Sequence, residues 1–143
     1  VPKSWGDAAR VVKQLSERDF PKLTDADAEA FARQLFNDVN GKPAAGYDAK
    51  IAQGFSVLDG PMPALWPQFL AMKRAPVLVI RGANSDLLSE ATVDEMMKRH
   101  PACISYTVPE EGHAPLLWDE GSQSAIASFF ARTDASAYAH AAA

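Results

Sequence analysis

The sequence lacks most of the features that mark specialised classes of protein. It has one cysteine in 143 residues, which excludes a disulfide framework and any metal site built from several cysteines, and which fits a reducing, cytoplasmic location. Its 14 basic and 18 acidic residues give a formal net charge of −4, so we expect neither nucleic acid nor an anionic membrane surface as a partner. No apolar run reaches the roughly 18 residues that a membrane span needs.

Signatures of bound cofactors are missing as well. The chain contains no glycine-rich phosphate loop, no dinucleotide-binding fingerprint and no zinc-ligand spacing, so we predict no cofactor and no metal. The sequence begins at Val1 without an initiator methionine and without a signal-like stretch, and nothing marks it for export. A small molecule is therefore the partner that we expect.

The first part of the chain has the pattern of helices and loops. Apolar residues at helical spacing predict a helix over Asp7–Arg18, with Ala8, Val11, Val12 and Leu15 on one face. Thr24 has the character of an N-cap, and the helix after it is predicted to continue to about Asn40. Its apolar face would comprise Ala28, Phe31, Ala32, Leu35, Phe36 and Val39. Glycine and proline are frequent over residues 41–63, so no long element is expected there.

From residue 64 onward the pattern alternates between strands and helices. Strands are predicted at 77–80 and 104–108, and helices at 64–72 (interrupted near Pro67), 89–99 and 122–131. Val77–Ile80 is a continuous apolar run, which is typical of a parallel strand covered on both faces. This order predicts an α/β fold with a parallel sheet and right-handed crossovers.

Two strands are too few for such a sheet. Parallel sheets are almost always covered on both faces, and sheets usually have about four to six strands. We therefore predict an incomplete sheet and a truncated chain. An exposed sheet edge favours strand pairing, either with a second copy in a homodimer or with the missing N-terminal half.

Two side chains capable of catalysis follow the predicted strands. Asp86 comes shortly after Val77–Ile80, and His113 comes shortly after Ile104–Val108. Functional groups in open parallel sheets gather at the carboxyl ends of the strands, so both residues are expected at that end of the sheet. A carboxylate beside an imidazole can fix the tautomer of the ring and stabilise its protonated form, as the acid and base of a nucleophilic triad do.

The same residues carry a family resemblance. Gly82–Leu88 (GANSDLL) and Glu110–Leu117 (EEGHAPLL) resemble the C-terminal part of the α/β hydrolases. The resemblance implies that Asp86 is the triad acid and His113 the triad base. It also implies a helical lid at 1–63 and a C-terminal core segment at 64–132. The composition of the last residues, rather than the resemblance, marks an Ala-rich tail at 133–143.

The nucleophile motif of that family, Gly-x-Ser-x-Gly, is absent from the sequence. The stretch Gly54–Leu58 (GFSVL) lacks the second glycine, and we do not predict Ser56 to be the nucleophile. The resemblance thus implies a fragment, inactive by itself, of a cofactor-independent hydrolase that cleaves small esters or lactones, with its serine outside this chain. An aspartate nucleophile would instead imply an epoxide or haloalkane hydrolase. A non-enzymatic, flavodoxin-like binding module is the alternative from a different class.

Other polar and apolar residues receive structural interpretations. Asn84 and Ser85 are predicted to form a turn, Cys103 to be a small buried residue, and Glu110 and Glu111 to be solvated charges rather than ligands or catalysts. Core packing is at least as good an interpretation as a substrate pocket for the remaining apolar candidates, which are Phe55, Met62, Trp66, Leu117 and Trp118.

Overall fold

The computed structural model describes residues 2–48, 50–51 and 64–141, and the chain divides into two compact units. Unit 1 comprises Val1–Ala64 and unit 2 comprises Leu65–Ala143. The predictions for Phe55, Ser56 and Met62 lie outside the described residues. Across the described part of the chain, no helix combines the length and apolar character needed to cross a membrane.

Unit 1 is built on two capped helices. The helix α1 (Trp5–Ser16) begins after Ser4, whose Oγ accepts a hydrogen bond from the Asp7 amide at 3.1 Å. The helix α2 (Asp25–Leu35) begins at a complete capping box formed by Thr24 and Asp27, which confirms the predicted N-cap. Small side chains let these helices pack closely: the core is Ala8, Val12 and Ala32, with Trp5, Phe31 and Phe36 against it.

A β-hairpin replaces the end of the second predicted helix. After Leu35 the chain forms β1 (Phe36–Val39) and β2 (Lys42–Ala45), which pair antiparallel. Asn40 and Gly41 connect them with φ angles of 53° and 76°, the left-handed pair that a two-residue hairpin turn requires. The predicted helix to Asn40 is therefore wrong beyond Leu35, because this turn reverses the chain.

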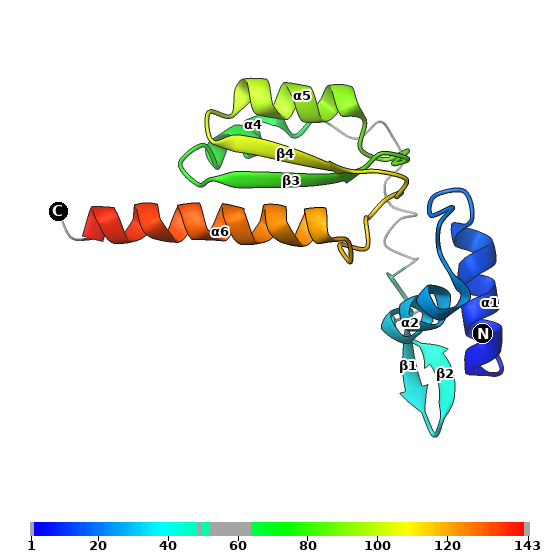
Figure 1. Cartoon of the computed structure of the whole chain (residues 1–143). Coiled ribbons are helices and arrows are strands. Elements are labelled where there is room, and N and C mark those ends of the chain that lie inside the picture. Colours follow the sequence, from blue (N-terminus) through cyan, green and yellow to red (C-terminus); the bar gives the residue numbers. More distant parts are fainter. Residues whose placement is uncertain (1, 49, 52–63, 142–143) are drawn as a thin grey trace. The chain divides into compact units, whose positions relative to one another are not determined.

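Unit 2 is an α/β arrangement with a parallel sheet, as predicted. The strands β3 (Val77–Gly82) and β4 (Cys103–Val108) pair parallel, in a register that runs from Val77 opposite Cys103 to Gly82 opposite Val108. The helices α4 (Trp66–Ala71) and α5 (Glu90–Arg99) lie on one face of this pair, and α6 (Glu120–Ala141) runs along the other (Figure 1). Within the described residues the sheet has two strands.

The core of unit 2 joins the sheet to α4 and α5. Val79, Val93 and Cys103 are its buried centre, with Phe69 and Met96 among the side chains packed against it. Burial raises the pKa of the Cys103 thiol, as expected for a buried structural cysteine.

Two details of unit 2 differ from the sequence prediction. Pro67 lies in the first turn of α4 instead of interrupting it, a position where its missing N–H costs no helical hydrogen bond. The last helix continues to Ala141 instead of ending near residue 131, so most of the Ala-rich tail is part of α6. Alanine has the highest helix propensity, which explains the continuation.

Candidate active site

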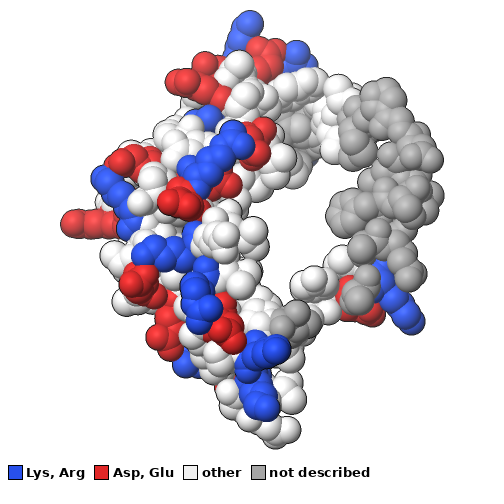
Figure 2. Space-filling model, turned by 90° about the vertical axis from the view of Figure 1, so that its right-hand side faces the viewer, with Lys and Arg blue, Asp and Glu red and all other residues white. Residues whose placement is uncertain are grey.

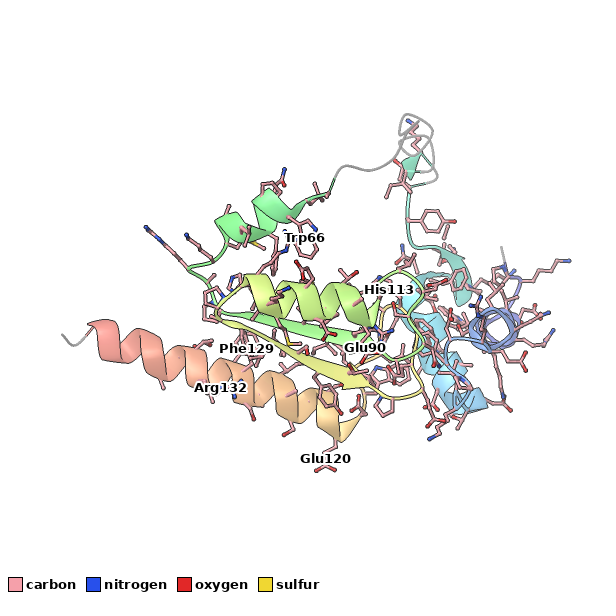
Figure 3. The ribbon with its side chains drawn as sticks, turned by 90° about the horizontal axis from the view of Figure 1, so that it is seen from above. Trp66, Glu90, His113, Glu120, Phe129 and Arg132 are labelled. Atoms are coloured by element: carbon pink, nitrogen blue, oxygen red, sulfur yellow. The ribbon has the colours of Figure 1, made fainter. Side chains whose placement is uncertain are left out.

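The loops that follow β3 and β4 lie side by side at the carboxyl ends of these two strands. Asp86 is in the first loop and His113 in the second. Two backbone hydrogen bonds of 2.8 Å hold the first loop. The Ala83 amide donates to the carbonyl of Val108 at the end of β4, and the Asn84 amide donates to the carbonyl of Glu111 in the second loop. In Figure 3, His113 and Glu90, the first residue of α5, are labelled at the same end of unit 2.

The two predicted catalytic side chains are both exposed on these loops. Among the described residues, no hydrogen bond or ion pair joins the Asp86 carboxylate to the His113 ring. The structure thus brings the loops together without a hydrogen bond or ion pair between these two side chains. Their roles as acid and base stay predictions, and catalytic hydrogen bonds can be long or absent before substrate binds.

The Asp86 loop is held in shape by one of its own side chains and by a side chain from the end of β3. Arg81 Nε donates to the Leu88 carbonyl at 2.6 Å and Arg81 Nη2 to the Ala83 carbonyl at 3.2 Å. Ser85 Oγ accepts from the Leu88 amide at 3.0 Å. These bonds close the loop on both sides of Asp86, and they confirm the predicted role of Ser85 as a turn residue.

The His113 loop depends on a residue that sequence reasoning missed. Glu111 was predicted to be a solvated charge, but its side chain is half-buried and its Oε2 accepts a hydrogen bond from the Leu116 amide at 2.7 Å. Burial raises the pKa of the Glu111 carboxyl above its ordinary value, the Leu116 amide opposes this rise, and the nearby Asp119 charge adds to it. No sequence signal distinguishes Glu111 from Glu110.

The far end of the same loop is anchored to β4 and α6. Asp119 Oδ1 accepts from the Ser122 amide at 2.8 Å, and Asp119 Oδ2 accepts from the fully buried Ser122 hydroxyl. Tyr106 on β4 adds a long hydrogen bond to Asp119. Burial acts to raise the pKa of Asp119, but these hydrogen bonds outweigh it and lower the pKa overall. Asp119 therefore caps α6 and fixes where the loop ends.

In the described part of unit 2, the cavity between two helices, the charged side chains and the candidate metal ligands form no second site. A cavity of about 230 Å³ lies between α4 and α5, lined by Leu65, Trp66, Phe69, Thr92 and Met96. Neither Asp86 nor His113 lines it. Figure 2 shows basic and acidic side chains interspersed with one another. Within the described ranges, no three His, Cys, Asp or Glu side chains gather in a group that could hold a metal ion.

The solved structure of an α/β hydrolase from Novosphingobium aromaticivorans superposes on this chain with a TM-score of 0.81 and 33% sequence identity. The match covers 92% of this chain. The chain belongs to the α/β-hydrolase superfamily. A curated relative, the 3-hydroxybutyrate-oligomer hydrolase of Cupriavidus necator, is 46% identical over 67 residues. No family model matches the sequence.

The relatives are longer than this α/β-hydrolase chain. It spans 47% of the length of the Novosphingobium structure and 22% of the length of the Cupriavidus enzyme. The match to the Cupriavidus enzyme covers 47% of this chain. The structure of E-2-(acetamidomethylene)succinate hydrolase is similar with a TM-score of 0.57 and 20% identity, over 94% of this chain and 46% of that one. This last likeness concerns the fold alone.

Proposed function

We propose that this chain supplies the acid and the base of a Ser-His-Asp hydrolase that cleaves small esters or lactones without a cofactor. His113 would take the proton of the attacking serine and return it to the leaving group, and Asp86 would orient the ring. The serine would lie outside residues 1–143. The observation that carries the proposal is the pair of hydrogen-bonded loops, in which Asp86 and His113 both lie at the carboxyl ends of the two strands.

The relatives support ester chemistry within this proposal. Oligomers of 3-hydroxybutyrate are chains of ester bonds, and the relative from Cupriavidus is a hydrolase of such oligomers. A short hydroxyacid ester is therefore a good first substrate to test. Unit 1, with its helices α1 and α2, is the part that we propose as the lid.

On this proposal residues 1–143 are part of a longer gene product, and the test uses that product with p-nitrophenyl butyrate and a 3-hydroxybutyrate dimer as substrates. Asp86→Asn should lower kcat on the order of 10,000-fold, and His113→Ala at least as much. Glu120→Gln, an exposed carboxylate at the start of α6, is the matched control and should leave kcat unchanged. Full activity in both triad variants would contradict the proposal.

Labelling separates the alternative nucleophiles. A serine nucleophile predicts covalent capture of a fluorophosphonate probe, and His113→Ala should weaken that capture because the serine loses its base. Turnover of epoxides or haloalkanes without capture would instead indicate an aspartate nucleophile. If the protein shows no capture and no turnover, that result would favour the non-enzymatic binding module.

A further inference from the structure

We propose that Glu111 is the positioning residue of this site: it fixes the loop that carries His113 and joins that loop to the one that carries Asp86. This inference rests on the proposed function, in which those two side chains act together. Glu111 itself would touch neither substrate nor the reacting atoms.

Glu111 makes one connection with its backbone and another with its side chain. Its carbonyl accepts from the Asn84 amide at 2.8 Å, which ties it to the Asp86 loop. Its carboxylate accepts from the Leu116 amide at 2.7 Å, which spans its own loop. His113 lies between Glu111 and Leu116 in the sequence, so the second bond closes the stretch of backbone that presents the imidazole.

The backbone around this stretch needs such a brace. Glu110 and Leu117 both have left-handed conformations, with φ angles of 58° and 61°. Non-glycine residues rarely adopt this region, and holding them there costs free energy that neighbouring contacts must offset. The bond from Leu116 to Glu111 lies between these two residues, where it can stabilise the bent loop.

The surroundings of the Glu111 carboxylate strengthen its hydrogen bond to the Leu116 amide. The Glu111 side chain is half-buried, and an amide bonded to a carboxylate in such a place forms a stronger bond than two neutral groups do. Asp119, whose charge acts on Glu111 from the end of the loop, is itself occupied by Ser122 and Tyr106. Among the described residues, the Glu111 carboxylate accepts from no amide other than that of Leu116.

The first experiment measures the brace itself in the 143-residue chain, so it does not depend on catalysis. Amide exchange of Leu116 is followed by NMR in the parent chain and in Glu111→Ala, Glu111→Gln and Glu120→Ala. Loss of the acceptor should speed Leu116 exchange roughly tenfold or more in Glu111→Ala. Glu111→Gln keeps an acceptor oxygen and should change exchange much less. Glu120→Ala should match the parent.

The second experiment measures the consequence for catalysis in the longer gene product. Glu111→Ala should lower kcat by roughly 10- to 100-fold with KM little changed, because misplacing a catalytic group by about 1 Å has effects of this size. Glu111→Gln should recover most of that loss. A purely structural role would lower the amount of folded enzyme instead, and leave kcat per folded molecule intact.

The outcomes separate this inference from the proposed function. Activity that survives Asp86→Asn and His113→Ala would overturn the proposed function, whatever Glu111 does. Loss in those two variants, together with parent-like Leu116 exchange and kcat in Glu111→Ala, would overturn the role of Glu111 alone. If the alanine variant does not fold, Glu111→Asp replaces it, since its shorter side chain should lose the bond while Glu111→Gln retains it.

Discussion

Gly82 shows at the residue scale why the two loops can meet. It ends β3, and a Cβ atom placed on it would lie 2.1 Å from the Gly112 carbonyl oxygen and 2.3 Å from that of Glu111. Real Cβ contacts are never this short, so any side chain would force the backbones apart. The glycine thereby permits the Asn84–Glu111 hydrogen bond, which links the Asp86 and His113 loops.

We expect Gly82→Ala to separate the loops and to destabilise unit 2. Relieving such overlap typically costs roughly 1–3 kcal/mol, and hydrogen exchange followed peptide by peptide should show faster exchange at Ala83 and Asn84. Gly6→Ala is the control, because its Cβ would meet nothing closer than 4.0 Å and alanine favours the helix by about 0.5–1 kcal/mol. Unchanged exchange in Gly82→Ala would contradict this expectation.

Glu111 should also leave a mark on the pH dependence of stability. Its folded-state pKa is raised above the ordinary 4.5, chiefly by burial, so the unfolded chain loses the proton at lower pH than the folded chain does. Stability should therefore fall as the pH rises from 4.5 through the folded pKa. Glu111→Gln should remove this decrease, measured by urea unfolding across that window; an unaltered pH profile in the variant would refute the assignment.

At the scale of elements, local signals fix the ends of the helices and the turn between β1 and β2. Ser4, Thr24 and Ser89 all cap helices with their hydroxyl oxygens. The Asn40–Gly41 turn ends the helical pattern after Leu35, although Phe36 and Val39 continue the apolar spacing of α2. The Asn40–Gly41 pair is a turn signal in the sequence, but the helical periodicity that runs up to it predicts a helix instead.

The capping box of α2 predicts both a stability change and a pH effect. Thr24→Ala should lower the stability of unit 1 by about 1 kcal/mol. Hydrogen bonds from the Thr24 side chain and backbone lower the pKa of Asp27 below 3.8. The stability from Asp27 is therefore present above 3.8 and is lost as the pH falls through the folded pKa. NMR titration should show the Asp27 pKa rising in Thr24→Ala, with Thr24→Ser as control.

At the scale of the whole molecule, the two strands of unit 2 differ in character. β3 is apolar on both faces over Val77–Ile80, whereas β4 carries Ser105 and Thr107. Interior strands of parallel sheets are apolar on both faces, as β3 is, whereas strands that carry polar residues, such as β4, suit the edge of a sheet. The amides of Val77 and Ala83 both donate hydrogen bonds on the side of β3 that faces β4. Successive amides of a strand point to opposite sides, so the amide of Ile80 faces the outer edge of β3.

We therefore expect the outer edge of β3 to pair with another strand, either from a second copy or from the further segment that the proposed function requires. Ile80→Pro should abolish that pairing, because proline removes the outward N–H and is tolerated at sheet edges. Sedimentation of the 143-residue chain should show association that the variant lacks. The control, Ile104→Val on β4, should behave like the parent chain, and association that persists in Ile80→Pro would exclude this edge.

The sequence by itself determined the features that depend on near neighbours: the helix caps, the parallel strands, and the placement of Asp86 and His113 after strands whose carboxyl ends share an edge. Only the tertiary structure decided how the two loops join. The Asn84–Glu111 bond, the close approach at Gly82 and the half-burial of Glu111 connect residues from separate strands and loops. Periodicity describes one element at a time, so contacts between elements become visible only when the chain has folded.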